Sequence, residues 1–187
     1  INLHHPVANC LDYAQLLQEK YRLLECNVVP AFSEESTLDS VSVGCYQLMA
    51  RYLQDDKEKI IGLGSGLTLK KALQRIDFDS LNTRCVALIS AMDADGQCNY
   101  YDDVPLLLTS KIKAKYYQWP APRYAQTADE YEMWCTNRLF RSVSGVAREA
   151  DVIFVGIGPL GTQSPIFKDG FINQAQMDEL TARGGIG

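Results

Sequence analysis

Short apolar runs that end in glycine alternate with amphipathic runs along this chain, and this alternation restricts the folds open to it. Residues 59–64 read KIIGLG and residues 150–158 read ADVIFVGIG. Continuous apolar runs of this length are typical of strands that helices cover on both faces. Strands that alternate with helices predict an α/β domain with a mostly parallel sheet and helices on both faces.

The same patterns place the remaining elements. We expect capping boxes at Thr127 with Glu130 and at Asn173 with Gln176, because each pair has the required spacing. The expected helices are 9–24, 36–54, one that begins near Leu67, 104–112, 128–140 and 174–183, and the expected strands are 25–31, 59–64, 84–90, 115–119 and 150–158.

Composition excludes several classes of function. The chain has 187 residues, which favours a single domain, and a net charge of −5, which argues against nucleic-acid binding by this chain. No signal peptide or membrane span is evident, so we expect a cytoplasmic protein. The chain begins at Ile1 and stops at Gly187, directly after a helical pattern. We therefore expect a fragment of one domain, 1–187, cut at both ends.

The cysteines have the pattern of free thiols. None of the six belongs to a C-x-x-C pair, and most lie in apolar runs, where cysteine behaves as a small hydrophobic residue. The only histidines are His4 and His5, so neither a zinc site nor a Cys–His catalytic pair is supported. We expect no metal and no cofactor.

The glycine loop GLGSGLTLKK, residues 62–71, carries the strongest functional signal. Ligands of α/β folds gather at the carboxyl ends of the strands, and this loop follows a predicted strand there. A helix that begins near Leu67 would direct free N–H groups at the loop, and Ser65 and Thr68 add hydroxyl groups. This arrangement suits a phosphate or another anion.

Three other interpretations compete with an anion site. A dinucleotide fingerprint needs G-x-G-x-x-G, but Gly62, Gly64 and Gly66 give G-x-G-x-G, and Ser90 stands where the acidic residue is wanted. A Walker loop is rejected because Leu67 follows Gly66 in place of lysine. A tight strand-to-helix turn without a ligand stays open from the residues alone.

Structural roles explain the nearby polar and aromatic residues more simply than ligand binding does. Lys70 and Lys71 could touch a phosphate, but a solvated helix face is the simpler assignment. Trp119 could stack on a sugar, but its place at a strand end favours a core aromatic.

The ordered set of segments IIGLGSGLTL, YYQWPAP, ADVIFVGIG, FKDGFI and ARGGIG resembles the effector-binding domain of SorC-type bacterial transcriptional regulators. The resemblance covers nearly the whole chain and is greatest to regulators of sorbose operons. It implies a Rossmann-like fold similar to phosphosugar isomerases and CoA transferases, with a sugar or sugar phosphate as ligand. It also implies an N-terminal helix-turn-helix domain, which this chain lacks, and tetrameric assembly.

The resemblance also implies which residues bind the effector. Gly64, Ser65, Gly66, Leu67 and Thr68 match the phosphate-binding turn of the family. The second loop comprises Ser90, Ala91 and Met92, and it departs from the glycine-rich sequence of relatives. The third loop comprises Gly156, Gly158 and Pro159 and faces the sugar end.

Two hypotheses follow. The first is a sensor without catalytic residues. Its ligand changes the arrangement of the subunits and thereby the affinity of the implied helix-turn-helix domain for operator DNA. The second is a sugar-phosphate isomerase on the same fold, which needs a carboxylate base. Asp93 and Asp95 are the acids near a predicted strand end that could serve.

Overall fold

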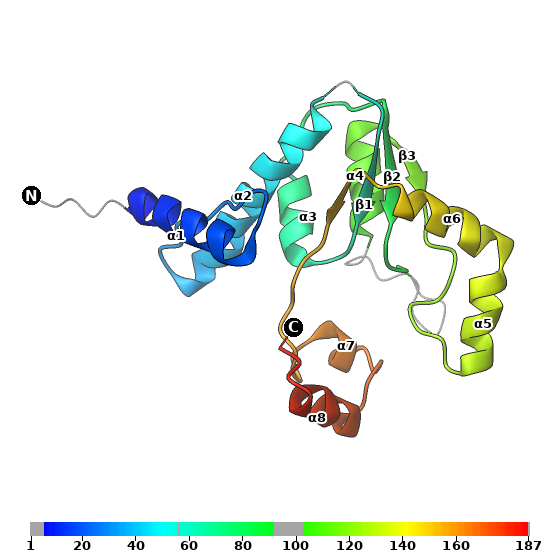
Figure 1. The fold of residues 1–187 in the computed structure, drawn as a ribbon. Coiled ribbons are helices and arrows are strands. Elements are labelled where there is room, and N and C mark those ends of the chain that lie inside the picture. Colours follow the sequence, from blue (N-terminus) through cyan, green and yellow to red (C-terminus); the bar gives the residue numbers. More distant parts are fainter. Residues whose placement is uncertain (1–5, 56, 92–102, 187) are drawn as a thin grey trace, which may run out of the picture.

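A parallel sheet forms the centre of the molecule (Figure 1). The computed structural model describes residues 6–55, 57–91 and 103–186. Its strands are β1 (Lys59–Leu63), β2 (Thr83–Ala87), β3 (Lys115–Tyr117) and β4 (Val152–Phe154), in the order β3-β2-β1-β4, with every neighbouring pair parallel. The helices are α1 (Pro6–Tyr21), α2 (Glu34–Leu53), α3 (Leu67–Leu73), α4 (Val104–Ile112), α5 (Ala128–Thr136), α6 (Arg138–Arg148), α7 (Pro165–Lys168) and α8 (Gln174–Ala182). The predicted α/β class is confirmed.

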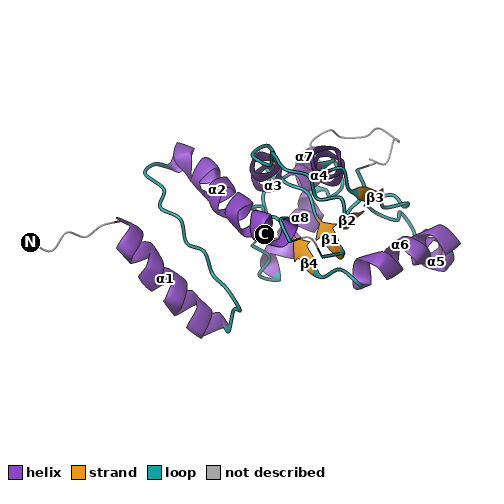
Figure 2. Ribbon diagram, turned by 90° about the horizontal axis from the view of Figure 1, so that it is seen from above, coloured by secondary structure: helices purple, strands orange, loops and turns teal. Residues whose placement is uncertain are grey.

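Helices cover both faces of the sheet, unequally. Figure 2 shows α3 and α4 on one side of the sheet and α6 on the other. Strand side chains alternate between the faces, so Ile61 and Leu63 enter the main core while Ile60 and Val86 pack against α6. The main core is built by α2, α3, α4 and the sheet, and its fully buried members include Met49, Leu53, Leu73, Leu108 and Ile112.

The strand order creates a switch point between β1 and β4. The chain steps from β1 to β2 to β3 in one direction and then returns to place β4 on the other side of β1. In open α/β sheets, ligands bind outside the carboxyl ends of the strands where the order reverses. The loops that follow β1 and β4 meet at that point.

The predicted strand at 25–31 is wrong. The segment lies outside the sheet and follows an irregular path beside α2. A Cβ atom added to Gly44 of α2 would come within 2.8 Å of Val29 Cγ1, so the segment packs closely on that helix. The apolar Val29 therefore packs on α2 and not in the sheet, and strand periodicity alone could not separate the two arrangements.

Several other predicted elements differ in extent, and two of the differences have a clear physical reason. The helix predicted at 128–140 is broken at Asn137, whose extended backbone ends α5 and whose side chain accepts hydrogen bonds from Leu139 N and Phe140 N of α6. The strand predicted at 150–158 is confined to β4, because it pairs only with β1, and β1 ends at Leu63. Asparagine is a preferred N-cap, so Asn137 is the signal in the sequence for a new helix within 128–140.

The capping boxes are confirmed at one site and half formed at the other. Asn173 and Gln176 exchange both hydrogen bonds of the motif. Thr127 accepts from Glu130 N, but the Glu130 carboxylate accepts from Gln126 N at 2.7 Å in place of the cap residue.

Cys85 provides a test of the core. It is fully buried in β2, and burial raises the pKa of its thiol to about 12. Because the thiolate is the reactive form, iodoacetamide at pH 8 is expected to leave Cys85 unmodified in the folded protein and to label it in urea, as peptide mass spectrometry would reveal. Labelling of Cys85 as fast as of half-exposed Cys26 in the native protein would contradict the burial.

The two ends of the described chain are held less tightly. Helix α1 stands away from the sheet, and α7 with α8 lies beyond the carboxyl ends of the strands (Figure 1). Several large apolar side chains of α1 and of the segment after it are exposed, including Leu11, Tyr13, Leu16, Tyr21 and Leu24.

Within the described residues, no helix is both long enough and apolar enough to cross a membrane.

Candidate functional site

The loop after β1 presents unused backbone amides at the switch point. The N–H of Gly64 still belongs to the sheet and donates to Phe154 O at 2.9 Å. The N–H groups of Ser65, Gly66, Leu67 and Thr68 donate no hydrogen bond to any described residue, and no side chain caps α3. Four adjacent donors at the carboxyl ends of the strands suit an anion or a polyol.

The three glycines of this stretch have different roles. Gly62 lies inside β1, where an added Cβ would meet Ile153 Cγ1 at 2.9 Å, so it serves close packing within the sheet. Gly66 has φ +127° and ψ 155°, a conformation that is almost restricted to glycine. A dinucleotide fingerprint uses its first glycine in the turn, so the position of Gly62 in the strand weakens that alternative.

The loop after β4 packs directly against the glycine loop. An added Cβ on Gly156 would lie 3.2 Å from Ser65 O, and one on Gly64 would lie 3.3 Å from Val155 Cγ1. Gly158 and Pro159 follow in the same loop and are exposed. The structure therefore brings the first and third predicted loops together.

The loop after β2 reaches the same edge. Leu88 N donates to Leu63 O at 2.9 Å, which places the following residues beside the glycine loop. Ser90 and Ala91 are buried there, at 2% and 8% exposure. Met92 lies outside the described residues, as do the candidate bases Asp93 and Asp95. Binding by these loops stays a prediction.

Sequence reasoning missed Arg123, in the loop after β3. Its Nη2 donates to Ser90 O at 3.2 Å, and its guanidinium carbon lies 5.0 Å from the centre of the Phe171 ring. Arg123 lines a pocket of about 330 Å³ formed by residues 122–126 and by Gly170, Phe171 and Gln176. An arginine directly after the YYQWPAP segment was the available signal.

Lys71 and Trp119 have structural contacts away from the glycine loop. Lys71 Nζ lies 2.5 Å from Asp39 Oδ1 of α2, and its hydrogen bond lowers the pKa of the Asp39 carboxyl. Lys71 is thus engaged away from the glycine loop. Trp119 packs in the α6 core, with its ring 5.0 Å from that of Phe140. The core assignment of Trp119 is confirmed.

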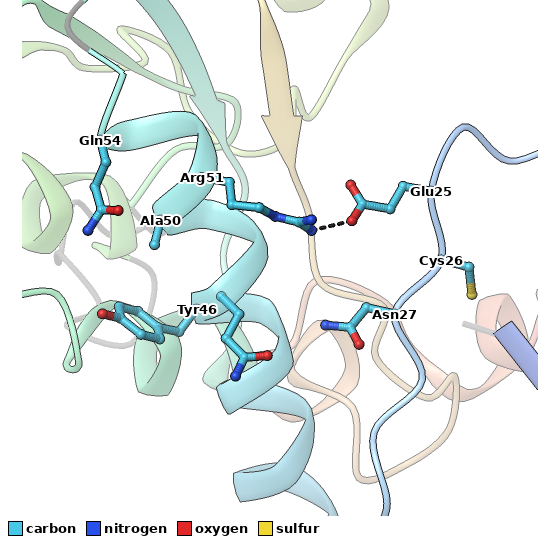
Figure 3. Close-up of a pocket in the computed structure, with 8 residues that line it drawn as sticks. Glu25, Cys26, Asn27, Tyr46, Ala50, Arg51 and Gln54 are labelled. Atoms are coloured by element: carbon cyan, nitrogen blue, oxygen red, sulfur yellow. Dashed lines mark hydrogen bonds and ion pairs between the residues drawn. The ribbon is translucent and has the colours of Figure 1, made fainter. Parts of the chain in front are cut away.

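A larger cavity, of about 520 Å³, lies between α2 and the segment that precedes it (Figure 3). Glu25 and Arg51 form an ion pair across it, and its other polar lining residues are Asn27, Tyr46, Gln47 and Gln54. This ion pair is about half exposed, and such surface pairs contribute little free energy. The cavity lies away from the strand ends, so we assign the site to the loops.

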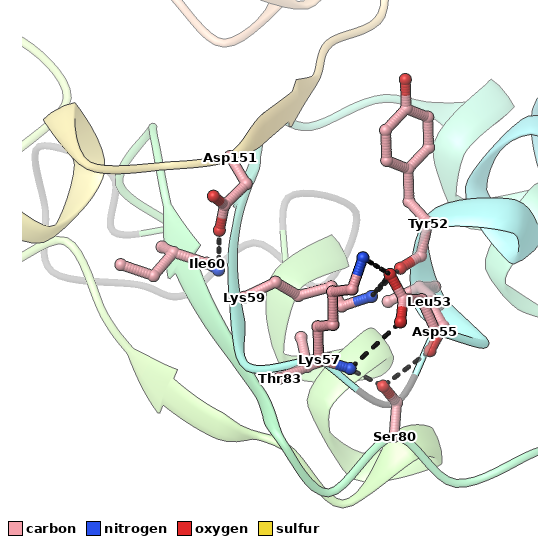
Figure 4. Close-up of polar contacts among 9 residues, drawn as sticks. All are labelled: Tyr52, Leu53, Asp55, Lys57, Lys59, Ile60, Ser80, Thr83 and Asp151. Atoms are coloured by element: carbon pink, nitrogen blue, oxygen red, sulfur yellow. Dashed lines mark hydrogen bonds and ion pairs between the residues drawn. The ribbon is translucent and has the colours of Figure 1, made fainter.

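The opposite edge of the sheet is closed by polar contacts (Figure 4). Asp151 Oδ2 accepts from Ile60 N at 2.7 Å, and the Lys59 ammonium donates to Tyr52 O. Ser80 Oγ donates to Leu53 O at 2.8 Å and pairs with Thr83 Oγ1 at 2.7 Å. These contacts join the end of α2 to the first residues of the strands and are structural.

Ser80 tests the structural role of this edge. Ser80→Ala is expected to lower the free energy of unfolding by about 1–3 kcal/mol, because it removes a buried donor from Leu53 O and a partner from Thr83. Urea unfolding measures the change. Ser110→Ala on the exposed face of α4 is the matched control. Equal stabilities of the two variants would contradict the assigned role.

No group of three or more potential metal ligands occurs among the described residues. What the strand ends offer is hydrogen-bond donors: backbone N–H groups, hydroxyl groups and one guanidinium. Such a set can bind phosphate, carboxylate or sugar hydroxyl oxygens.

Comparison with known proteins gives a consistent result. A family model described as "Putative sugar-binding domain" matches residues 5–187. The erythritol catabolism regulatory protein EryD of Brucella abortus is 26% identical over 191 aligned residues, which cover 100% of this chain and 60% of EryD. The chain therefore spans less than two thirds of the length of this relative.

Solved structures share the fold. A DeoR family transcriptional regulator from Listeria monocytogenes has a TM-score of 0.78 at 22% identity, covering 93% of this chain and 68% of that one. The full-length sorbitol operon regulator SorC from Klebsiella pneumoniae has a TM-score of 0.77 at 20% identity. The match covers 98% of this chain and 60% of the SorC chain.

Proposed function

Since this chain belongs to the sugar-binding domain family, whose model matches nearly all of it, we propose that it is the effector-sensing domain of a carbohydrate-responsive transcriptional regulator. The effector is a sugar or sugar phosphate held by the loops after β1, β2 and β4. We propose the cytoplasm as its location and 1–187 as one domain of a longer protein.

One observation carries this proposal: the amides of residues 65–68, which donate to no residue in the described part of the chain, lie where the strand order reverses. These residues are partly exposed, so a ligand that arrives from solvent can reach them. A ligand oxygen would satisfy these donors. The packing of Gly156 against Ser65 O brings a second loop to the same ligand.

A thermal-shift screen followed by calorimetry tests the proposal. The panel pairs tetrose, pentose and hexose phosphates with their unphosphorylated parents. A ligand present at one hundred times its dissociation constant should stabilise the fold by about 2.7 kcal/mol. A protein that binds no member of the panel would contradict the proposal.

Control of DNA binding belongs to the whole protein. We propose that the remaining part of a full-length chain carries a helix-turn-helix domain and that the effector changes its affinity for operator DNA. A coupling free energy of about 1–3 kcal/mol is typical. Operator binding by the full-length protein, measured with and without effector, would reveal this coupling, and an unchanged affinity would oppose it.

We propose that the protein assembles as a homo-oligomer, a tetramer as in the regulators it resembles. The exposed apolar side chains of α1 support this, because an isolated helix of 16 residues is only marginally stable in water. Sedimentation velocity on the full-length protein tests the assembly. A monomer at micromolar concentration would oppose it.

The isomerase alternative depends on Asp93 or Asp95, both outside the described residues. Homology to a catabolism regulator favours sensing over turnover. Incubation with pentose and hexose phosphates separates the two, because a sensor leaves them unchanged.

A further inference from the structure

Helices α7 and α8 belong to a small unit of their own, residues 160–186. The chain enters this unit at Leu160 and leaves it at Ile186, and the two residues are joined by a hydrogen bond of 2.9 Å from Leu160 N to Ile186 O. Met177 of α8 is buried, at 3% exposure. The unit therefore has a closing contact and a buried side chain of its own, so it can move as one body.

The unit is only weakly joined to the rest of the described chain. The hydrogen bonds that its residues make within the described chain have both partners inside the unit. Two ring contacts join it to the body of the domain instead. The Phe171 ring lies 5.0 Å from the guanidinium carbon of Arg123 and 4.9 Å from the Tyr124 ring. Contacts of this kind are individually weak, so they can break and form again.

The connection between the unit and the sheet has few contacts that would hold it in one conformation. Residues 157–159 follow the point where Gly156 packs on Ser65 O, and their backbone groups form no hydrogen bond within the described chain. Ile157 is 92% exposed, and a Cβ atom added to Gly158 would meet no atom within 4 Å. An exposed backbone with few contacts marks a segment that can move at low cost in free energy.

The unit also lies where movement would matter for a ligand. Figure 1 shows α7 and α8 beyond the carboxyl ends of the strands. A pocket of about 330 Å³ separates Gly170, Phe171 and Gln176 of the unit from residues 122–126 of the body. The connection to the sheet is itself part of the loop after β4. Movement of the unit would therefore open and close the space beside the candidate site.

We infer that residues 160–186 form a lid that swings about residues 157–159. Contact of the Phe171 ring with Arg123 and Tyr124 latches the lid closed, and the arrangement in Figure 1 is the latched one. The hinge and the latch follow from these contacts alone. Retention of the effector under the lid rests, in addition, on the proposed function, because a closed lid slows the release of a ligand beneath it.

Pulsed dipolar EPR measures this movement without any ligand. Nitroxide labels attached to a keto amino acid at Ala175 of α8 and at Arg141 of α6, both exposed, report the distance from lid to body in the full-length protein, diluted with unlabelled subunits. Phe171→Ala should raise the ratio of open to closed lid about tenfold, because it removes both ring contacts. Phe171→Tyr keeps the ring and should keep the lid closed. Phe32→Ala truncates an 84% exposed ring before α2 and is the matched control.

The other outcomes are equally decisive. A narrow distance distribution that Phe171→Ala leaves unchanged would overturn the inference. So would loss of amide-exchange protection in α8 of that variant, because the unit would then unfold instead of moving as one body.

The effector adds a second readout. A sugar that calorimetry has shown to bind should shift the distribution toward the closed distance and leave the Phe171→Ala protein about tenfold faster. An unchanged rate of release would overturn retention by the lid. Failure of every sugar to bind would instead contradict the proposed function, while the distances measured without ligand would still decide whether the lid moves.

Discussion

Replacement of Gly66 by alanine is expected to abolish or strongly weaken effector binding and also to lower stability. The backbone of Gly66, at φ +127° and ψ 155°, is strained for any L-residue by about 1–3 kcal/mol. A Cβ atom there would meet no atom within 4 Å, so the cost comes from the backbone and not from crowding. Relaxation of the turn would redirect the amides of Ser65 and Leu67.

Gly145→Ala is the matched control for this variant. Gly145 lies within α6 and lacks a positive φ, and a Cβ atom added there would meet open space. Alanine there should stabilise the helix by roughly 0.5–1 kcal/mol and leave effector affinity unchanged. Urea unfolding and calorimetry measure both effects. A Gly66→Ala protein with native affinity would show that the turn does not need this geometry.

Leu63→Ala is expected to produce the largest loss of stability, about 2–5 kcal/mol, because it leaves a cavity in a core that cannot fully collapse. Leu63 is fully buried at the end of β1, and its carbonyl oxygen accepts from Leu88 N. Domains of this size are stable by only about 5–15 kcal/mol, so a substantial fraction would be lost. The midpoint of urea unfolding reports the change.

Leu139→Ala provides the comparison on an exposed surface. The Leu139 side chain is 60% exposed on α6, so its truncation should change stability by no more than about 0.5 kcal/mol. Equal effects at the two positions would mean that the sheet does not bury Leu63 as the structure shows.

Much of the fold could be predicted from local pattern. Residues 104–112 form a helix with the predicted bounds, and 59–64 contains β1, because their apolar spacing reflects burial directly. The same reasoning wrongly predicted a strand at 25–31. Val29 packs against Gly44 of α2, and no local pattern states whether an apolar run meets a strand or a helix.

The candidate site divides in a similar way. The glycine loop was visible in the sequence, because a strand end followed by Gly64, Ser65 and Gly66 predicts a turn with open amides. That Gly156 would pack on Ser65, and that Arg123 would reach Ser90, depends on strand order. The members of each pair lie far apart in the chain, and only the order of the strands brings the loops that carry them to one edge of the sheet.

The sequence by itself determined most of the helices and sheet strands and where a ligand-binding turn could form, since periodicity and glycine act over a few residues. The tertiary structure decided which loops meet. It placed β4 beside β1, packed Gly156 against the carbonyl of Ser65, and brought the Arg123 guanidinium to Ser90 O. Contacts between residues far apart in the chain arise from the packing of whole elements, and their partners leave no mark in local spacing.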